Sequence, residues 1–230
     1  MNQTEFMNEL AKINININQK QLKMLEKYYI YLTGEAEKYN LTTIINKEDV
    51  YWKHFYDSLT IVRIIKLEKS MKVCDVGSGA GFPGVVLKII FPKIELTLVE
   101  ASGKKAKFLS NLCYQLDIKA TIINDRAENM KNIEEFDLVV ARAVASTPIL
   151  LEITATIIKI GGNLVLYKSN ISREIENLGN IDVGLKKINC ITFDLPFEKG
   201  RRALFLFKKH KKTPQKYPRN YNLIKKKPIF

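Results

Sequence analysis

The sequence predicts an α/β fold in which a mainly parallel sheet is wrapped by helices, closed by an antiparallel hairpin and covered by an N-terminal helical cap. Short apolar runs alternate with helical patterns from residue 72 onward, which is typical of a parallel sheet. Two further β-like runs near the C-terminus have no long helix between them, and the N-terminal part has only helical periodicity. We therefore expect a cap over 1–65, a core over 66–208 and a basic tail over 209–230.

Two helices are expected in the cap. The first begins at a capping box formed by Asn18 and Gln21 and ends near Gly34, and the second begins near Asn46. Each has an apolar face that another part of the chain must cover: Leu22, Leu25, Tyr29 and Leu32 on the first, and Trp52, Phe55, Leu59 and Val62 on the second.

The core is expected to contain five parallel strands with helices between them. The expected strands are 72–76, 95–99, 120–123, 137–141 and 163–167, and the expected helices are about 83–91, 103–116 and 146–159. The runs at 187–193 and 203–207 lack a crossover helix, so they must pair antiparallel or lie apart. Five parallel strands closed by a late hairpin resemble the class I S-adenosylmethionine-dependent methyltransferase sheet more than a plain dinucleotide fold.

Composition excludes several protein classes. No apolar run approaches the roughly 20 residues that a helix needs to cross a bilayer. The N-terminus has no signal-peptide pattern, so we expect a cytoplasmic protein without a membrane partner. Cys74, Cys113 and Cys190 are odd in number and far apart, which predicts neither a disulfide framework nor a metal site.

Positive charge is concentrated at the C-terminal end. The net charge is +13, and residues 199–230 hold 12 of the 37 Lys and Arg residues and no acid. The other 25 basic residues face 24 acids, so the body has a charge of only +1. A basic end on a nearly neutral body indicates a polyanionic partner such as RNA, although a merely solvated Lys-rich end is the alternative. The candidate RNA-binding residues are Arg126, Arg202, Lys208, Lys209, Lys211, Lys212 and Arg219.

The strongest local signal is a glycine-rich turn after the first expected strand, which reads DVGSGAGFPG from Asp75. Gly77, Gly79 and Gly81 would let a ligand lie against bare backbone. Glu100 ends the next strand, where its carboxylate can bind two ribose hydroxyls. The turn and Glu100 together predict a nucleoside cofactor, and the glycine spacing alone also fits NAD.

Asp75 favours S-adenosylmethionine over NAD. It precedes the first glycine, where methyltransferase turns commonly carry an acid that helps to hold the amino-acid end of the cofactor. The other interpretation is that Asp75 accepts hydrogen bonds from the amides of its own turn.

The glycine turn resembles the signature of the small-subunit ribosomal RNA guanine-N7 methyltransferases (RsmG, formerly glucose-inhibited division protein B). Further motifs of that family follow in order over most of the chain: Tyr39-Asn40-Leu41-Thr42, Trp52-x-His54-x-x-Asp57-Ser58-Leu59, Arg126-Ala127-Glu128, Arg142-Ala143 and Lys216-Tyr217-Pro218-Arg219. The glycine turn alone is not specific, but the set is.

The resemblance implies roles for particular residues. Gly77 and Phe82 would contact the cofactor, Ala127 and Glu128 would flank its adenine, and Arg142 would lie beside it and face the substrate. The implied target is N7 of guanosine 527 in 16S rRNA, so the partner would be 16S rRNA or the small ribosomal subunit, with no obligate protein partner evident. The chain departs from the family pattern at 220–223, where Asn-Tyr-Asn-Leu replaces a Gly/Pro-rich segment.

The chain lacks the catalytic motifs of methyltransferases that act on cytosine C5 or on exocyclic amines, which agrees with guanine N7 as the target. None of the cysteines follows a proline, as a cytosine-C5 nucleophile usually does, and the fourth strand ends in Ala-Arg-Ala-Val rather than an Asn/Asp-Pro-Pro-aromatic turn. Guanine N7 carries no proton, so transfer needs positioning and no general base. We expect Arg142 to position the guanine, and Arg126 and Arg202 to hold the RNA backbone. An Arg–carboxylate bridge is the alternative for Arg142 and Arg202.

His54, Asp57 and Ser58 lie within five residues of one expected helix, which excludes the converging geometry of a hydrolase triad. We expect a polar cluster that fixes the cap to the sheet, with RNA contact as the alternative. At the level of the whole chain, two other functions stay open: an NAD(P)-dependent oxidoreductase, and a non-enzymatic RNA-binding or assembly factor on a methyltransferase fold.

Overall fold

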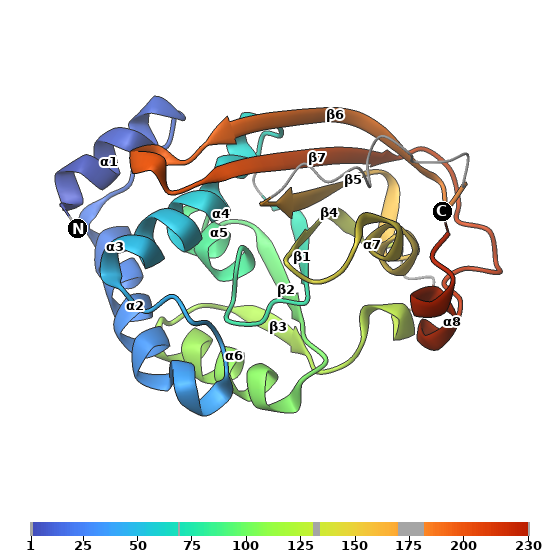
Figure 1. Ribbon diagram of the computed structural model, residues 1–230, viewed down its shortest axis with the longest axis horizontal. Helices are drawn as coiled ribbons and strands as arrows, with labels where there is room; N and C mark the ends of the chain where they lie inside the picture. The colour runs from blue at the N-terminus through green and yellow to red at the C-terminus, as the bar shows by residue number, and fades with distance from the viewer. Residues whose placement is uncertain (1, 69, 131–133, 170–181, 230) are drawn as a thin grey trace.

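The computed structural model describes residues 2–68, 70–130, 134–169 and 182–229. Its centre is a seven-stranded sheet in the order β3-β2-β1-β4-β5-β7-β6 (Figure 1). The strands are β1 (Lys72–Val76), β2 (Glu95–Val99), β3 (Ala120–Ile123), β4 (Phe136–Arg142), β5 (Ile158–Lys168), β6 (Leu185–Asp194) and β7 (Arg201–Lys209).

The strand directions confirm the predicted fold class. β1 to β5 are parallel, and β7 inserts antiparallel between β5 and β6. The connection between β6 and β7 is too short for a crossover helix, so antiparallel pairing is the arrangement available to it.

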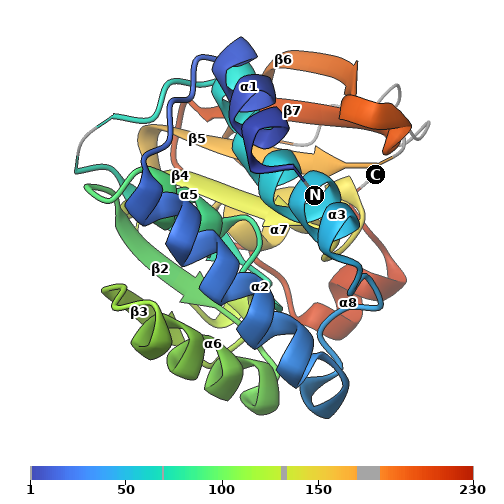
Figure 2. The same cartoon turned by 90° about the vertical axis from the view of Figure 1, so that its left-hand side faces the viewer.

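Helices cover both faces of the sheet (Figures 1 and 2). On one side of the sheet lie α5 (Gly84–Ile90) and α6 (Gly103–Gln115), with α2 (Gln19–Tyr39) packed against these two helices. On the other side lies α7 (Thr147–Thr154), with α8 (Tyr221–Lys226) packed against it. Strand residues alternate between the two apolar cores: Val140 belongs to the first, while Val139 and Ala141 belong to the second.

The cap contains more helix than the sequence predicts. α1 (Gln3–Lys12) was not predicted, and it buries Phe6 and Leu10. α2 begins at the predicted capping box but continues past Gly34 to Tyr39. The prediction that Gly34 ends this helix is wrong because Ala36 and Tyr39 are buried beyond it, and their packing offsets the roughly 1 kcal/mol that glycine costs inside a helix. Asn40, with φ of 50°, ends the helix instead.

The second cap helix is continuous but irregular. Asn46 caps α3 (Lys47–Val50), which runs into a π-helical segment η1 (Tyr51–Tyr56), then α4 (Asp57–Leu59) and a 3₁₀ turn η2 (Thr60–Arg63). The amide of Asp57 donates to the Trp52 carbonyl, the five-residue span of a π-helix.

The largest boundary difference in the second half of the chain lies between α7 and β5. The helix expected over 146–159 ends at Thr154, and β5 already begins at Ile158. A continuous apolar run fits a buried helix and a buried strand equally well, so the pattern could not locate this transition.

The residues expected to form a tail are packed on the body. Ile224 of α8 is fully buried in the core beside α7, and Arg219 is bonded to Glu152 of α7. Within the part of the chain that the structure describes, no helix is long and apolar enough to cross a membrane.

Candidate functional site

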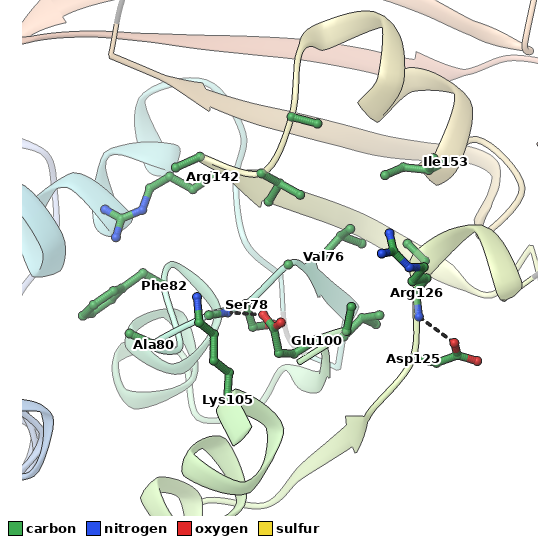
Figure 3. A pocket seen from close by; sticks show the side chains of 18 of the residues that line it. Val76, Ser78, Ala80, Phe82, Glu100, Lys105, Asp125, Arg126, Arg142 and Ile153 are labelled. Atoms are coloured by element: carbon green, nitrogen blue, oxygen red, sulfur yellow. Dashed lines mark hydrogen bonds between the residues drawn. The ribbon is translucent and has the colours of Figure 1, made fainter. Parts of the chain in front are cut away.

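A cavity of about 450 Å³ opens at the carboxyl ends of β1, β2 and β4, where ligands bind in open parallel sheets. Figure 3 shows it extending from Phe82 and Arg142, past Ser78 and Glu100, to Arg126 and Ile153. The predicted residues that line it are Gly77, Gly79, Phe82, Glu100, Arg126, Ala127, Glu128 and Arg142. The structure therefore brings most of the predicted cofactor-binding residues to one place.

The glycine turn forms the floor of the cavity with two left-handed residues. Gly77 has φ of 70° and Gly79 has φ of 56°, which side chains rarely tolerate. A Cβ on Gly77 would also lie 2.5 Å from a methyl group of Val144. Glycine at 77 is thus required by both conformation and space.

Glu100 is held in place by backbone amides. The amide of Gly79 donates to Oε2 at 2.9 Å, and the amide of Ser102 donates to Oε1 at 2.8 Å. The side chain is buried at the edge of the cavity, and each oxygen keeps lone-pair capacity for another donor. This carboxylate can accept hydrogen bonds from two vicinal hydroxyls of a ligand.

Two of the predicted cofactor-binding residues, Asp75 and Gly81, are not among the residues that line the cavity. Asp75 is fully buried, and its Oδ2 accepts from the amide of Gly84 at 2.8 Å, as in the alternative interpretation. Burial raises the pKa of Asp75 to about 7. Gly81 faces the cap, since a Cβ there would lie 2.6 Å from the Tyr28 hydroxyl oxygen.

The end of the cavity near β3 is formed by the segment 125–128. Arg126 is half-exposed, whereas Ala127 and Glu128 are buried. Oε1 of Glu128 is buried and lies 3.7 Å from the Arg126 guanidinium, too far for a hydrogen bond, and it has no hydrogen-bond partner among the described residues. A buried acceptor without a donor is costly, which makes this atom a candidate contact for a ligand N–H or O–H.

The opposite end contains a charged cluster that joins the sheet to the cap. Arg142, at the end of β4, donates to Oδ2 of Asp57 at 3.1 Å and to the Lys53 carbonyl at 3.2 Å. Nε of Arg202 lies 3.3 Å from the same Asp57 oxygen. The bridge foreseen as the alternative for Arg142 and Arg202 is therefore present, although Arg142 also lines the cavity.

His54 completes this cluster. Its ring stacks on Phe82 with centroids 4.6 Å apart, and its Nδ1 lies 3.2 Å from the Arg142 guanidinium. Burial and then the neighbouring Arg142 charge lower the pKa of His54 to about 3, so the ring is neutral near pH 7. The expectation that His54 and Asp57 fix the cap to the sheet is confirmed, and both side chains are buried.

A second cavity of about 260 Å³ adjoins this end and shares His54, Arg142 and Ala143 with the first. Its basic lining residues are Lys53, Arg142, Lys168 and Arg202. Four cations around one buried carboxylate make this cavity suitable for an anionic ligand.

The C-terminal cations fall into two groups. Lys208 and Lys212 are exposed, as an RNA contact requires. The prediction for Lys209 is wrong: its side chain is fully buried, and Nζ donates to the Ala155 carbonyl at 2.5 Å and to Thr213. Side chains on alternate positions of β7 point to opposite faces, so adjacent lysines have opposite environments.

Lys211 and Arg219 also have partners within the protein. Lys211 pairs with Asp182. Arg219 forms a bidentate pair with Glu152, whose side chain is fully buried. Arg219 therefore anchors the C-terminal segment, and most of its guanidinium hydrogen bonds go to groups within the protein.

Sequence reasoning missed several lining residues. Lys105 extends from α6 toward the middle of the cavity (Figure 3), and Thr42 and Tyr221 also line it. Ser102, two residues after Glu100, caps α6, so Lys105 lies in the first turn of a helix that begins beside the predicted cofactor-binding carboxylate. This position in the sequence could have identified Lys105 as a lining residue. Among the described residues, no group of three or more His, Cys, Asp or Glu side chains could hold a metal ion.

Comparisons with known proteins agree with this geometry. Residues 21–189 match the GidB family model, described as rRNA small subunit methyltransferase G. Proteins named "Ribosomal RNA small subunit methyltransferase G" are similar over nearly the whole chain. The one from Staphylococcus carnosus is 37% identical and covers 96% of both chains. The one from Bacillus cytotoxicus is 39% identical and covers 100% of this chain and 99% of the relative.

Solved structures resemble the fold at low sequence identity. A mutant of MtNAS in complex with S-adenosylmethionine has a TM-score of 0.55 at 13% identity, and covers 79% of this chain and 75% of its own. A candidate class I S-adenosylmethionine-dependent methyltransferase from Listeria monocytogenes has a TM-score of 0.53 at 13% identity, covering 70% of this chain and 61% of its own.

Proposed function

Since the chain belongs to the rRNA small subunit methyltransferase G family and is an S-adenosylmethionine-dependent rRNA methyltransferase, we propose that it methylates N7 of a guanine in 16S rRNA, guanosine 527. Family membership decides against an NAD(P)-dependent oxidoreductase and against a factor without enzymatic activity. The proposed partner is 16S rRNA within the small ribosomal subunit, and the proposed location is the cytoplasm.

The observation that carries the proposal is the amide-anchored Glu100 carboxylate beside two left-handed glycines in one cavity. These residues fit S-adenosylmethionine, because the carboxylate matches the ribose hydroxyls and the bare backbone permits close approach. We assign cofactor binding to Gly77, Gly79, Phe82, Glu100, Ala127, Glu128 and Arg142, all of which line the cavity.

The two ends of the cavity suggest the orientation of the cofactor. The Arg142 end adjoins the second, cation-lined cavity, where an RNA nucleotide can enter. The methyl group must face the substrate, so the adenine belongs at the opposite end, beside Ala127 and Glu128. This orientation also gives Oε1 of Glu128, which has no hydrogen-bond donor among the described residues, a polar partner on the adenine.

The chemistry asks for positioning rather than proton transfer. S-adenosylmethionine supplies a methyl group on its sulfonium, and guanine N7 presents an in-plane lone pair without a proton. Arg142 is placed to donate to the guanine O6 or to a nearby phosphate, which leaves N7 free. The neutral His54 and the Asp57 carboxylate hold the guanidinium from the cap side. Accurate placement of two reactants supplies several kcal/mol of a barrier (roughly 7 to 11 in good cases).

Guanine N7 lies in the deep major groove when RNA is paired, so the target base must come from a loop or be flipped out. The test uses small subunits from cells lacking this protein, incubated with the purified protein and labelled S-adenosylmethionine. We expect one labelled guanosine, at position 527, with borohydride–aniline cleavage at that site reporting N7 methylation. Label at another atom or nucleotide would overturn the proposed target, and naked 16S rRNA assayed in parallel identifies the preferred substrate form.

A further inference from the structure

The C-terminal helix α8 lies against the cofactor cavity. Tyr221, its first residue, lines the main cavity together with Gly77 and Glu100. Both of these residues come more than 100 positions earlier in the chain. The same tyrosine lines a smaller adjoining cavity of about 350 Å³ with Arg126 and Glu128. Tyr221 also falls in the four residues at which this chain departs from the family pattern.

Tyr221 is paired with a residue of the cavity rim. The guanidinium carbon of Arg126 lies 4.5 Å from the centroid of the Tyr221 ring, a cation–π contact. Both side chains line the end of the cavity that holds Ala127 and Glu128. The Arg126 guanidinium and the Tyr221 ring therefore meet beside the proposed adenine position.

The helix that carries Tyr221 is fixed at both ends. Before it, the Arg219 backbone and side chain bond to the buried Glu152 at 2.7 to 2.9 Å, and the Asn220 side chain caps the first turn. After it, the Arg219 guanidinium also donates to the Lys227 carbonyl at 2.9 Å. Ile224 is fully buried between these anchors. A side chain on such a support can determine the shape of a binding site.

We propose that Tyr221 and Arg126 form a wall over the adenosine end of the cofactor cavity and set the affinity for S-adenosylmethionine and S-adenosylhomocysteine. The inference rests on the proposed assignment of this cavity to the cofactor. It gives the chain end a role in the methyl-donor site, in place of the RNA-binding arm that its charge suggests.

The test is calorimetric titration of S-adenosylhomocysteine into the full-length protein and three variants of α8. Tyr221→Ala should raise Kd by roughly 5- to 20-fold, the range expected for loss of one aromatic contact to a base. Tyr221→Phe keeps the ring and should stay within about twofold of the parent. Leu223→Ala is the matched control, because Leu223 lies on the same helix and is exposed, outside the cavity.

A second measurement does not depend on the loss of a side chain. Trp52 is the only tryptophan of the chain and is buried, so Tyr221→Trp adds one reporter at the proposed wall. S-adenosylhomocysteine should quench the added fluorescence by stacking of its adenine, and homocysteine alone should not.

The outcomes separate the two proposals. If the unchanged protein does not bind S-adenosylhomocysteine, the assignment of the cavity is overturned. If the unchanged protein binds, two results would overturn only the proposed role of Tyr221 and Arg126. One is equal affinity of Tyr221→Ala for S-adenosylhomocysteine, and the other is the absence of quenching in Tyr221→Trp. Equal weakening by Leu223→Ala would also overturn this role, because the effect would then come from the helix and not from the tyrosine.

Discussion

Arg142 at the end of β4 donates a hydrogen bond to Asp57 of the cap, 3.1 Å away and 85 residues earlier in the chain. Asp57 is almost fully buried and also lies 3.3 Å from Arg202 of β7. One carboxylate thus holds two arginines of the sheet beside the proposed substrate cavity.

Arg142→Ala is expected to lower the rate constant of methyl transfer at saturating rRNA by about 100-fold, because a misplaced base loses in-line alignment with the methyl group. The free energy of unfolding should change less than the methylation rate, since Asp57 keeps Arg202 as a partner. Single-turnover methylation at saturating rRNA, with thermal unfolding as the control, measures both. Turnover equal to that of the parent protein would show that Arg142 has no positioning role.

Asp57→Asn should destabilise the fold by about 3 kcal/mol, because it leaves two partly buried guanidinium groups without a counter-charge. Asp49→Asn is the matched control. Asp49 pairs with Lys53 and Lys199 in a more exposed setting, where ion pairs contribute about 1 kcal/mol or less. Urea unfolding measures both variants, and a loss at Asp57 no larger than at Asp49 would contradict the role given to this carboxylate.

Glu100→Gln is expected to weaken S-adenosylhomocysteine binding by about 10- to 100-fold. In Gln the NH2 group replaces one carboxylate oxygen, so it would face one of the two backbone N–H donors that hold Glu100, and two donors repel. The variant also loses the charge-assisted hydrogen bonds to the ribose. Calorimetry at one pH measures the change, with the exposed Glu37→Gln as control. Unaltered affinity would remove Glu100 from the cofactor site.

His54 and Asp75 predict opposing effects of acid on stability. The pKa of His54 is lowered to about 3, so below pH 6.5 the unfolded state binds the extra proton and the fold loses stability, about 2 kcal/mol at pH 5. The pKa of Asp75 is raised to about 7, so between pH 7 and 3.8 the folded state binds the extra proton and gains about 3 kcal/mol at pH 5.

The two effects nearly cancel in the parent protein and should separate in the variants. On going from pH 8 to pH 5, the free energy of unfolding of His54→Asn should rise relative to the parent, because only the Asp75 effect remains, and that of Asp75→Asn should fall, because only the His54 effect remains. Urea unfolding at the two pH values gives these differences. Parallel pH profiles for all three proteins would show that neither group has the described environment.

The neighbours Lys208 and Lys209 are expected to respond in opposite ways to alanine substitution. Lys208→Ala should lower the salt dependence of RNA binding by about 0.7 to 0.9 per lost phosphate contact, with no change in Tm. Lys209→Ala should lower Tm and leave that slope unchanged, because Nζ of Lys209 bonds to Ala155 inside the protein. Filter binding across a salt series and thermal unfolding compare them; the same response from both lysines would contradict their opposite burial.

The sequence predicted those features that depend on local signals. The bounds of β1, β2 and β3 coincide with the expected ones, because each strand is a short apolar run closed by turn residues. The glycine turn and Glu100 were also located, since their chemistry follows from their own spacing.

The remaining features depend on packing between distant segments. The burial of Lys209 is one such feature: alternation along β7 places it on the same face as Phe207, but the Ala155 carbonyl that its Nζ bonds lies 54 residues earlier in the chain. Asp75 carries the expected residue type at the expected position, but its direction is set by the Gly84 amide. Tyr221 reaches the cavity only because Arg219 and Ile224 dock the chain end on α7.

The π-helical segment makes spacing in the cap as important as composition. Each residue of an α-helix turns the chain by about 100°, so one residue inserted into or deleted from Tyr51–Tyr56 would rotate Asp57 away from the sheet. Every side chain of the charged cluster would still be encoded, yet Arg142 would face solvent. Relatives should therefore tolerate substitutions along this segment far more readily than gaps in it.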